Sequence, residues 1–154
     1  MATITSIGES AKKLGLVENF KNVLTNHYAD FSGRARRSEY WYFVLAGIVL
    51  LVPFYVIGTI GAAAESGLLS TVGFGIYAII ALAITIPQFA LAVRRLHDTG
   101  RSGWWYLIQL IPVLGSIVLL VFLCQDSEAG ANKWGPNPKT GADDVIDHLS
   151  LEKA

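Results

Sequence analysis

A short polar stretch lies between two long apolar runs: residues 94–105 read RRLHDTGRSGWW. Residues 94–103 carry three arginines and one aspartate, whereas the apolar run before them, at 68–93, has no charged residue. Clustered arginine beside an apolar run is typical of the cytoplasmic end of a membrane-spanning helix, and tryptophan is enriched at the bilayer surface. We therefore interpret residues 94–105, which we call the arginine turn, as a cytoplasmic connection between two spanning helices.

The composition of the whole chain also favours a membrane environment. Hydrophobic residues make up 53% of the 154 residues and charged residues 16%, whereas soluble domains average about 45–50% and about 25%. A short chain leaves much of its surface exposed when it folds, so this much apolar surface requires lipid rather than water as its solvent. The net charge is zero, which gives no general attraction to nucleic acid.

The chain contains three apolar runs of spanning length, at residues 40–62, 68–93 and 104–124. A helix needs about 20 residues, at about 1.5 Å each, to cross the hydrocarbon core of a bilayer. We therefore predict an all-α fold, a small polytopic membrane protein with three transmembrane helices. The loop at 62–67 has one acidic residue and no lysine or arginine, so we expect it on the non-cytoplasmic side.

The third run differs from the other two because Pro112 and Gly115 lie near its middle. We expect one kinked span here. The alternative is a broken or re-entrant helix, which membranes tolerate where protein buries the interrupted backbone. The choice decides the side of the C-terminal tail: a full span places the tail outside the cytoplasm, and a hairpin returns it to the cytoplasm.

The segment at 8–31 has the pattern of an amphipathic helix. Apolar residues recur at intervals of three or four and fall on one helical face: Leu14, Val17, Phe20, Leu24, Tyr28 and Phe31. The segment is too polar to span a membrane. Two interpretations stay open: an interfacial helix that lies on the cytoplasmic surface of the bilayer, or a helix that packs against the rest of the protein.

The next segment, FSGRARRSEYW at 31–41, places Arg34, Arg36 and Arg37 directly before the first apolar run. By the rule applied to the arginine turn, this segment lies on the cytoplasmic face, and the N-terminus is cytoplasmic. Glu39 suits the first turn of the following helix, where a carboxylate meets the positive end of the helix dipole. The two arginine-rich segments are therefore expected to face each other.

The residues after the third run are polar, and residues 125–154 hold three lysines and six acidic residues. The sequence GANKWGPNPKTG at 130–141 is typical of a loop, because glycine, proline and asparagine favour turns. The last twelve residues, 143–154, predict a short helix. We therefore divide the chain into an N-terminal amphipathic and arginine-rich segment, 1–38, a transmembrane helical domain, 39–124, and the polar tail.

Four motifs in the same order resemble a known bacterial family: FSGRARRSEYW at 31–41, RRLHDTGRSGWW at 94–105, IPVLG at 111–115 and GANKWGPNP at 130–138. They are similar to the family catalogued as domain of unknown function 805, and the resemblance covers roughly residues 20–138. It implies a small polytopic protein of the bacterial inner (plasma) membrane. It implies no activity, because none is assigned to the family. Trp134 stands where the family's pattern favours a smaller aromatic residue.

The charged and imidazole side chains of the two arginine-rich segments form the candidate site: Arg34, Arg36, Arg37, Glu39, Arg94, Arg95, His97, Asp98 and Arg101. In our main interpretation these residues are structural. Arg94 or Arg95 pairs with one of the two acidic residues across the helix ends, because a charge near the membrane needs a partner. The protein would then be a structural or interaction membrane protein, a scaffold with a cytoplasmic arginine cluster.

Two other interpretations of the protein's function stay open. A ring of guanidinium groups binds phosphate through paired hydrogen bonds, so the cluster could instead bind anionic lipid headgroups or a phosphorylated ligand. The third interpretation is a subunit of a small oligomeric transporter or channel. Transport paths usually carry ionisable residues inside the bilayer, and this chain offers mainly Gln88 and Gln109 there.

No enzymatic activity, catalytic residue, cofactor or metal site is predicted. His97 and Asp98 could act as a base and the group that orients it, but no nucleophile is placed beside them and the neighbouring arginines oppose a bound cation. The expected partners are the lipid bilayer, with anionic lipids in the second interpretation, and a second copy or another membrane protein. Nucleic acid is not an expected partner.

Overall fold

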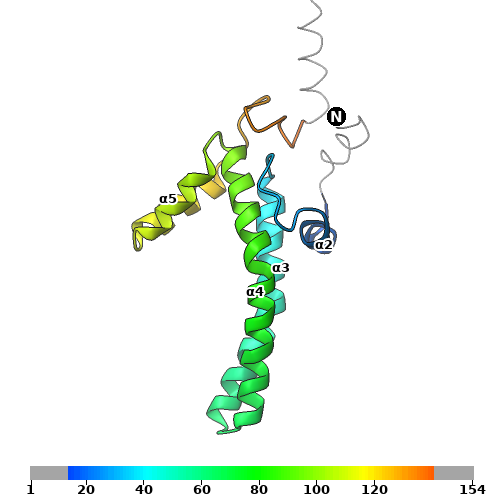
Figure 1. The fold of residues 1–154 in the computed structure, drawn as a ribbon, viewed down its shortest axis with the longest axis vertical. Coiled ribbons are helices and arrows are strands. Elements are labelled where there is room, and N and C mark those ends of the chain that lie inside the picture. The colour runs from blue at the N-terminus through cyan, green and yellow to red at the C-terminus, as the bar shows by residue number, and fades with distance from the viewer. Residues whose placement is uncertain (1–13, 141–154) are drawn as a thin grey trace, which may run out of the picture.

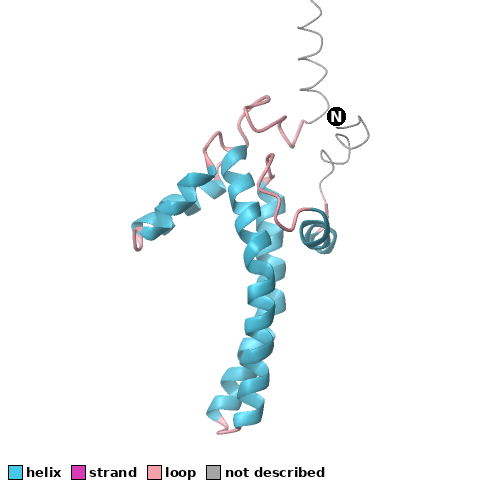
Figure 2. Ribbon diagram, viewed as in Figure 1, coloured by secondary structure: helices cyan, strands magenta, loops and turns pink. Residues whose placement is uncertain are grey.

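The computed structural model describes residues 14–140 of the 154. Its two longest helices, α3 (Arg37–Ala63) and α4 (Gly67–Asp98), pack against each other along their length (Figure 1). Both are long and apolar enough to cross a membrane. The described residues form helices and loops but no β-strand (Figure 2), which confirms the all-α class and the first two predicted apolar helices. The helix predicted at 143–154 lies outside the described residues.

Glycine residues let the backbones of α3 and α4 approach closely in the half of the pair that is distant from the arginine turn. A Cβ atom on Gly73 would lie 2.4 Å from the backbone nitrogen of Gly58, and one on Gly61 would lie 2.4 Å from that of Ser70. The outward faces stay uncovered, since Ile79 is 70% exposed and Leu82 is 73% exposed. Contiguous apolar exposure of this extent suits contact with lipid rather than with water.

The third apolar run is not a continuous helix. It forms a 3₁₀-helix, η1 (Gly103–Leu110), and a short α-helix, α5 (Leu114–Cys124), which pack on each other. Pro112 cannot donate a backbone hydrogen bond and interrupts the helix, and Val113 turns the chain with a positive φ of 64°. Gly115 permits the close return, because a Cβ atom there would lie 1.7 Å from the Ile108 carbonyl oxygen.

The η1–α5 hairpin, residues 103–124, therefore replaces the single kinked span that we expected, and three spans are not confirmed. In Figure 1 this hairpin projects from the end of α4 that carries the arginine turn, and α5 returns to the same end. Residues 125–140 consequently lie beside the arginine turn. This position is the one that the broken-helix alternative predicts, and it differs from the opposite-side tail of the three-span prediction.

Helix α2 (Leu16–Asn26) is shorter than the helix predicted at 8–31. It packs against α3: Val23 is buried, and the Phe20 and Phe43 rings stack at 5.0 Å. Tyr28 lies beyond the helix end, where its hydroxyl donates to the Ala83 carbonyl oxygen at 2.7 Å. The helix-like spacing of apolar residues thus continues past the end of α2 into a loop, which is held by contacts with α4. The predicted residues 8–13 lie outside the described part of the chain.

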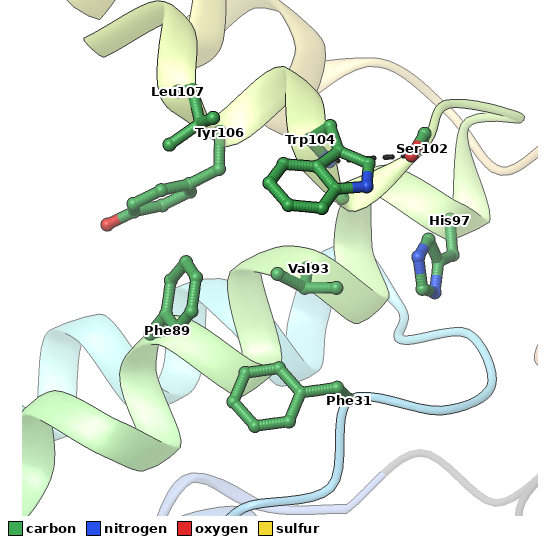
Figure 3. Close-up of a pocket in the computed structure, with 9 residues that line it drawn as sticks. Phe31, Phe89, Val93, His97, Ser102, Trp104, Tyr106 and Leu107 are labelled. Carbon is green, nitrogen blue, oxygen red and sulfur yellow. Dashed lines mark hydrogen bonds between the residues drawn. The ribbon is translucent and has the colours of Figure 1, made fainter. Parts of the chain in front are cut away.

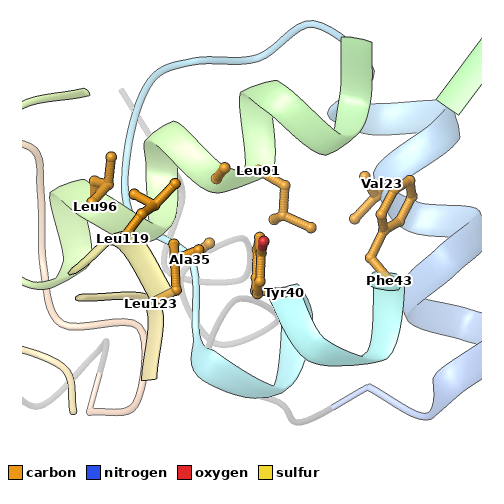
Figure 4. Close-up of a cluster of buried hydrophobic side chains, with 9 residues drawn as sticks. Val23, Ala35, Tyr40, Phe43, Leu91, Leu96, Leu119 and Leu123 are labelled. Atoms are coloured by element: carbon orange, nitrogen blue, oxygen red, sulfur yellow. The ribbon is translucent and has the colours of Figure 1, made fainter. Parts of the chain in front are cut away.

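The buried apolar core is small and lies at one end of the α3–α4 pair (Figure 4). It gathers side chains from α2, α3, α4, α5 and the loop before α3: Val23, Ala35, Tyr40, Phe43, Leu91, Ala92, Leu96, Leu119 and Leu123. Every described helix therefore converges at this end, since Tyr106 and Ile108 of η1 also pack against the cluster. The same convergence brings the two arginine-rich segments and the tail together.

Candidate functional site

Asp98, the last residue of α4, is fully buried and accepts hydrogen bonds from three segments of the chain. Its Oδ1 accepts from Arg34 Nε at 3.0 Å. Its Oδ2 accepts from Arg95 Nη1, one helical turn earlier, and from the Ser127 hydroxyl at 2.6 Å. We call these four residues the Asp98 centre. It joins the segment before α3, the end of α4 and the tail through one carboxylate.

The two arginines also donate to backbone carbonyl groups, most of which lie in residues 123–135. Arg34 Nη1 donates to the Gly130 oxygen at 2.7 Å, and Nη2 donates to the Glu128 oxygen at 2.6 Å. Arg95 Nε donates to the Leu123 oxygen at 3.1 Å, and its Nη2 donates to the oxygen of Gln125. Two guanidinium groups meet only one carboxylate here, so the carbonyl dipoles stabilise the second buried positive charge.

Three further predicted arginines also bind the tail or its approach. Arg36 Nε donates to the Pro138 oxygen at 2.6 Å, and Arg37 forms a 3.5 Å ion pair with Asp126. Arg101 donates to Gln125 Oε1 at 2.6 Å, and its guanidinium lies over the Phe122 ring. The arginines therefore do not point at one common position, as a ring of phosphate donors would. They surround and hold residues 123–139 instead.

Arg94 differs from the other arginines of the site. Its side chain is only 5% exposed, yet its guanidinium makes no hydrogen bond with the described residues, and Nε is a buried donor without a partner. The Glu39 and Asp30 carboxylates interact with it electrostatically, but neither lies within ion-pair distance. Glu39 instead accepts from the Arg36 backbone N–H at 3.0 Å and caps α3. The structure thus brings Arg95 and Asp98 into contact, and not Arg94 and Glu39.

His97 and Asp98 are adjacent in sequence but face different partners. Nδ1 of His97 lies 3.1 Å from the Gly33 carbonyl oxygen, and the imidazole stacks on Trp134 at 4.5 Å. Asn132 donates to the His97 carbonyl oxygen at 3.0 Å. The Asp98 carboxylate therefore does not orient the imidazole, and the arrangement holds the tail. The described residues also contain no group of three potential metal ligands.

Sequence reasoning missed the contribution of the tail to this site. The tail supplies mostly main-chain carbonyl acceptors, which carry no side-chain signature. It also supplies the Ser127 hydroxyl, which donates to Asp98, and the Trp134 ring, which stacks on His97. One signal was present: the two arginine-rich segments hold six arginines but only Glu39 and Asp98 as acidic residues. That excess of buried donors requires acceptors from elsewhere in the chain.

The chain is similar to a protein family and to individual relatives over most of its described length. A family model described as "Protein of unknown function (DUF805)" matches residues 28–136, from the loop before α3 to the tail. The chain is 41% identical over 126 residues to Inner membrane protein YhaH of Escherichia coli K12, covering 78% of this chain and 95% of the relative. It is 43% identical over 123 residues to Inner membrane protein YhaI of the same organism, covering 80% and 97%. No solved structure matches. The chain therefore belongs to the DUF805 family of proteins of unknown function.

Proposed function

We propose that this protein is an integral protein of the bacterial inner membrane in which α3 and α4 cross the bilayer. Both helices are long enough to cross the bilayer and expose many apolar side chains, which supports this placement. The names of the two relatives support it as well. Arginine is concentrated at one end of the helix pair, and positive charge beside a span stays in the cytoplasm. The N-terminus, the arginine turn and the tail then share the cytoplasmic side, and Glu65 lies on the other side.

The η1–α5 hairpin enters this arrangement from the cytoplasmic face and returns to it. Neither of its helices reaches the length of a span, since α5 has 11 residues and η1 has 8, against about 20 for a crossing helix. Its apolar side chains are largely exposed, as Leu110 and Val113 illustrate. The protein thus has two spans and one re-entrant or interfacial hairpin.

Within the membrane the protein acts as a structural or interaction scaffold. The observation that carries this function is the buried Asp98 carboxylate, which accepts from Arg34, Arg95 and Ser127 and so locks three segments into one cytoplasmic unit. Five of the six arginines donate hydrogen bonds to other residues of this chain. Their guanidinium groups therefore do not form an unoccupied ring that could bind phosphate. Glu65 is the only charged residue between positions 40 and 93, which argues against a transport path through the spans.

A cysteine-labelling experiment tests the placement. Cys124 is replaced by serine, and single cysteines are introduced as Glu65→Cys or Lys133→Cys. An impermeant thiol reagent added to intact spheroplasts should label position 65, and position 133 should react only after lysis. Labelling of position 133 in intact spheroplasts would contradict the two-span arrangement.

Native mass spectrometry of the purified protein tests the scaffold function against headgroup binding. The wild type and the Arg94→Ala/Arg95→Ala double variant are compared for retained anionic and zwitterionic lipid. We expect the same lipid ratio in both, because Arg95 donates to Asp98 and to backbone carbonyl groups and Arg94 is buried, so neither guanidinium is available to a headgroup phosphate. Preferential anionic lipid on the wild type, lost in the double variant, would favour the headgroup-binding alternative.

A further inference from the structure

An open cavity of about 320 Å³ lies between α4, η1 and Phe31, and His97 forms part of its wall (Figure 3). Phe89 of α4 and Tyr106 of η1 line it and contact each other edge to face with ring centroids 4.8 Å apart, and Phe31 packs edge-on against Phe89. The walls are thus mainly aromatic. The volume falls in the lower part of the usual range for small-molecule sites, about 300–1,000 Å³.

One end of the cavity is polar, and two side chains there have unused hydrogen-bonding capacity. A carbonyl oxygen only accepts, so Nδ1 of His97 carries the proton in its contact with Gly33, and Nε2 of the neutral ring is an acceptor. His97 is more than nine-tenths buried, and Nε2 has no partner among the described residues. The Ser102 oxygen accepts weakly from the Trp104 N–H at 3.4 Å, and its hydroxyl proton has no acceptor among those residues.

This pairing of groups selects the chemistry of a ligand. A hydroxyl group can both donate, as Nε2 requires, and accept, as the Ser102 hydroxyl requires, whereas a carboxylate only accepts and an ammonium only donates. No lysine or arginine among residues 14–140 lines the cavity, and Arg34 and Arg95 are turned toward Asp98. A phosphate would therefore enter an aromatic site without a counter-charge, which is unfavourable.

We propose that this cavity binds the hydroxyl end of a neutral membrane lipid of the diacylglycerol class. The free hydroxyl meets His97 and Ser102, and the first part of the acyl chains lies along Phe89 and Tyr106. The rim is apolar and open, since Leu107 is 50% exposed and Trp104 is 78% exposed, so the chains continue onto the lipid-facing surface. This proposal rests on the membrane placement proposed above, and the test below is independent of which side of the membrane each segment occupies.

The test uses the full chain in detergent with a diazirine-bearing 1,2-dioctanoylglycerol as a photoprobe. Peptide mass spectrometry should locate the adducts near Phe89 in α4 and in η1. Unlabelled dioctanoylglycerol should compete for the site, and its 3-O-methyl ether should compete about fivefold more weakly, the usual effect of one lost neutral hydrogen bond. Equal competition by the methyl ether, or equally strong competition by octanoate, would overturn the proposal.

Two tryptophan variants of η1 separate cavity binding from general adsorption. Leu107 lines the cavity and Leu110 does not, although both are exposed on the same short helix. Leu107→Trp should reduce photolabelling about fivefold by occupying the site, and Leu110→Trp should leave it unchanged, with both variants keeping the wild-type elution volume. Equal labelling of the two folded variants would overturn the proposal, while the cysteine-labelling result for the spans would stand separately.

Discussion

Arg94 and Arg95 are consecutive residues of α4 and both are buried, yet only Arg95 has its guanidinium bonded. Successive residues of an α-helix point about 100° apart, so the two side chains meet different surroundings. Arg95 faces Asp98 and the tail, whereas Arg94 faces the side of α2 and α3, where the nearest carboxylates are not in direct contact. One side of the helix end is a closed polar network, and the other holds a buried charge without hydrogen bonds.

The difference shows how this protein stabilises its charges. On the Arg95 side, the carbonyl oxygens of Leu123 and Gln125 provide hydrogen-bond acceptors in addition to the Asp98 carboxylate. On the Arg94 side, none of the described residues 14–140 provides such an acceptor, and Asn19 Oδ1 is a second buried atom without a partner among them. Residues 125–140 are therefore part of the folded unit at this end of the molecule.

The largest expected effect comes from Asp98→Asn. This change leaves Arg34 and Arg95 buried with no negative charge, and breaking a buried ion pair in this way costs about 3–5 kcal/mol. Glu39→Gln is the matched control on the Arg94 side, because Glu39 forms no ion pair within 4.0 Å among the described residues and glutamine can still cap α3. Denaturant unfolding in detergent measures both. Equal losses would contradict the comparison.

The next largest effect separates the two arginines themselves. Arg95→Met removes four hydrogen bonds of the buried network, and we expect a loss of about 2–3 kcal/mol in the free energy of unfolding. Arg94→Met removes no hydrogen bond seen among the described residues, so its cost should stay below about 1 kcal/mol. The same unfolding assay compares them. A larger loss for Arg94→Met would contradict the conclusion that Arg95 is the arginine that stabilises this end of α4.

A smaller effect is expected where the tail stacks on α4. Trp134→Ala removes the ring that lies on His97, and an aromatic pair contributes about 0.5–1.5 kcal/mol beyond its buried area. Limited proteolysis should then cut residues 125–140 faster than in the wild type. Lys133→Ala leaves the stacked pair in place and removes only the ammonium that lies 4.2 Å from the centroid of the Trp134 ring, so it should increase cleavage less than Trp134→Ala does. Unchanged cleavage in Trp134→Ala would show that stacking on His97 does not stabilise residues 125–140.

The smallest effect concerns the exposed rim of the network. The hydrogen bond from Lys139, followed by that from the Ser127 N–H, holds the pKa of Asp126 below its ordinary value. The resulting stabilisation is present above the ordinary pKa of an aspartate and is lost as the pH falls through the lowered value. Solvent screens the pair, so the gain is slight. An NMR titration should show a higher pKa for Asp126 in Lys139→Met, and an unchanged pKa would contradict the contact.

Sequence patterns predicted the long elements well because those elements follow from local rules. Apolar runs at 40–62 and 68–93 became α3 and α4, and the Pro112–Gly115 pair marked the break that the structure contains. The helical spacing of Tyr28 and Phe31 was misleading, because their apolar side chains contact α4 from a loop. A periodic pattern reports which side chains are buried, and a loop beside a helix can bury them equally well.

The sequence by itself determined the class of this protein: two apolar helices, a concentration of arginine at one end of them, and membership of a bacterial family. These features depend on composition and on spacing within single segments. Only the tertiary structure decided how the arginines are used, because the acceptors are backbone carbonyls of residues about 30 to 100 positions away. Every residue carries a backbone carbonyl group that can accept a hydrogen bond. Which carbonyl groups accept from Arg34 or Arg95 therefore depends only on how the chain folds.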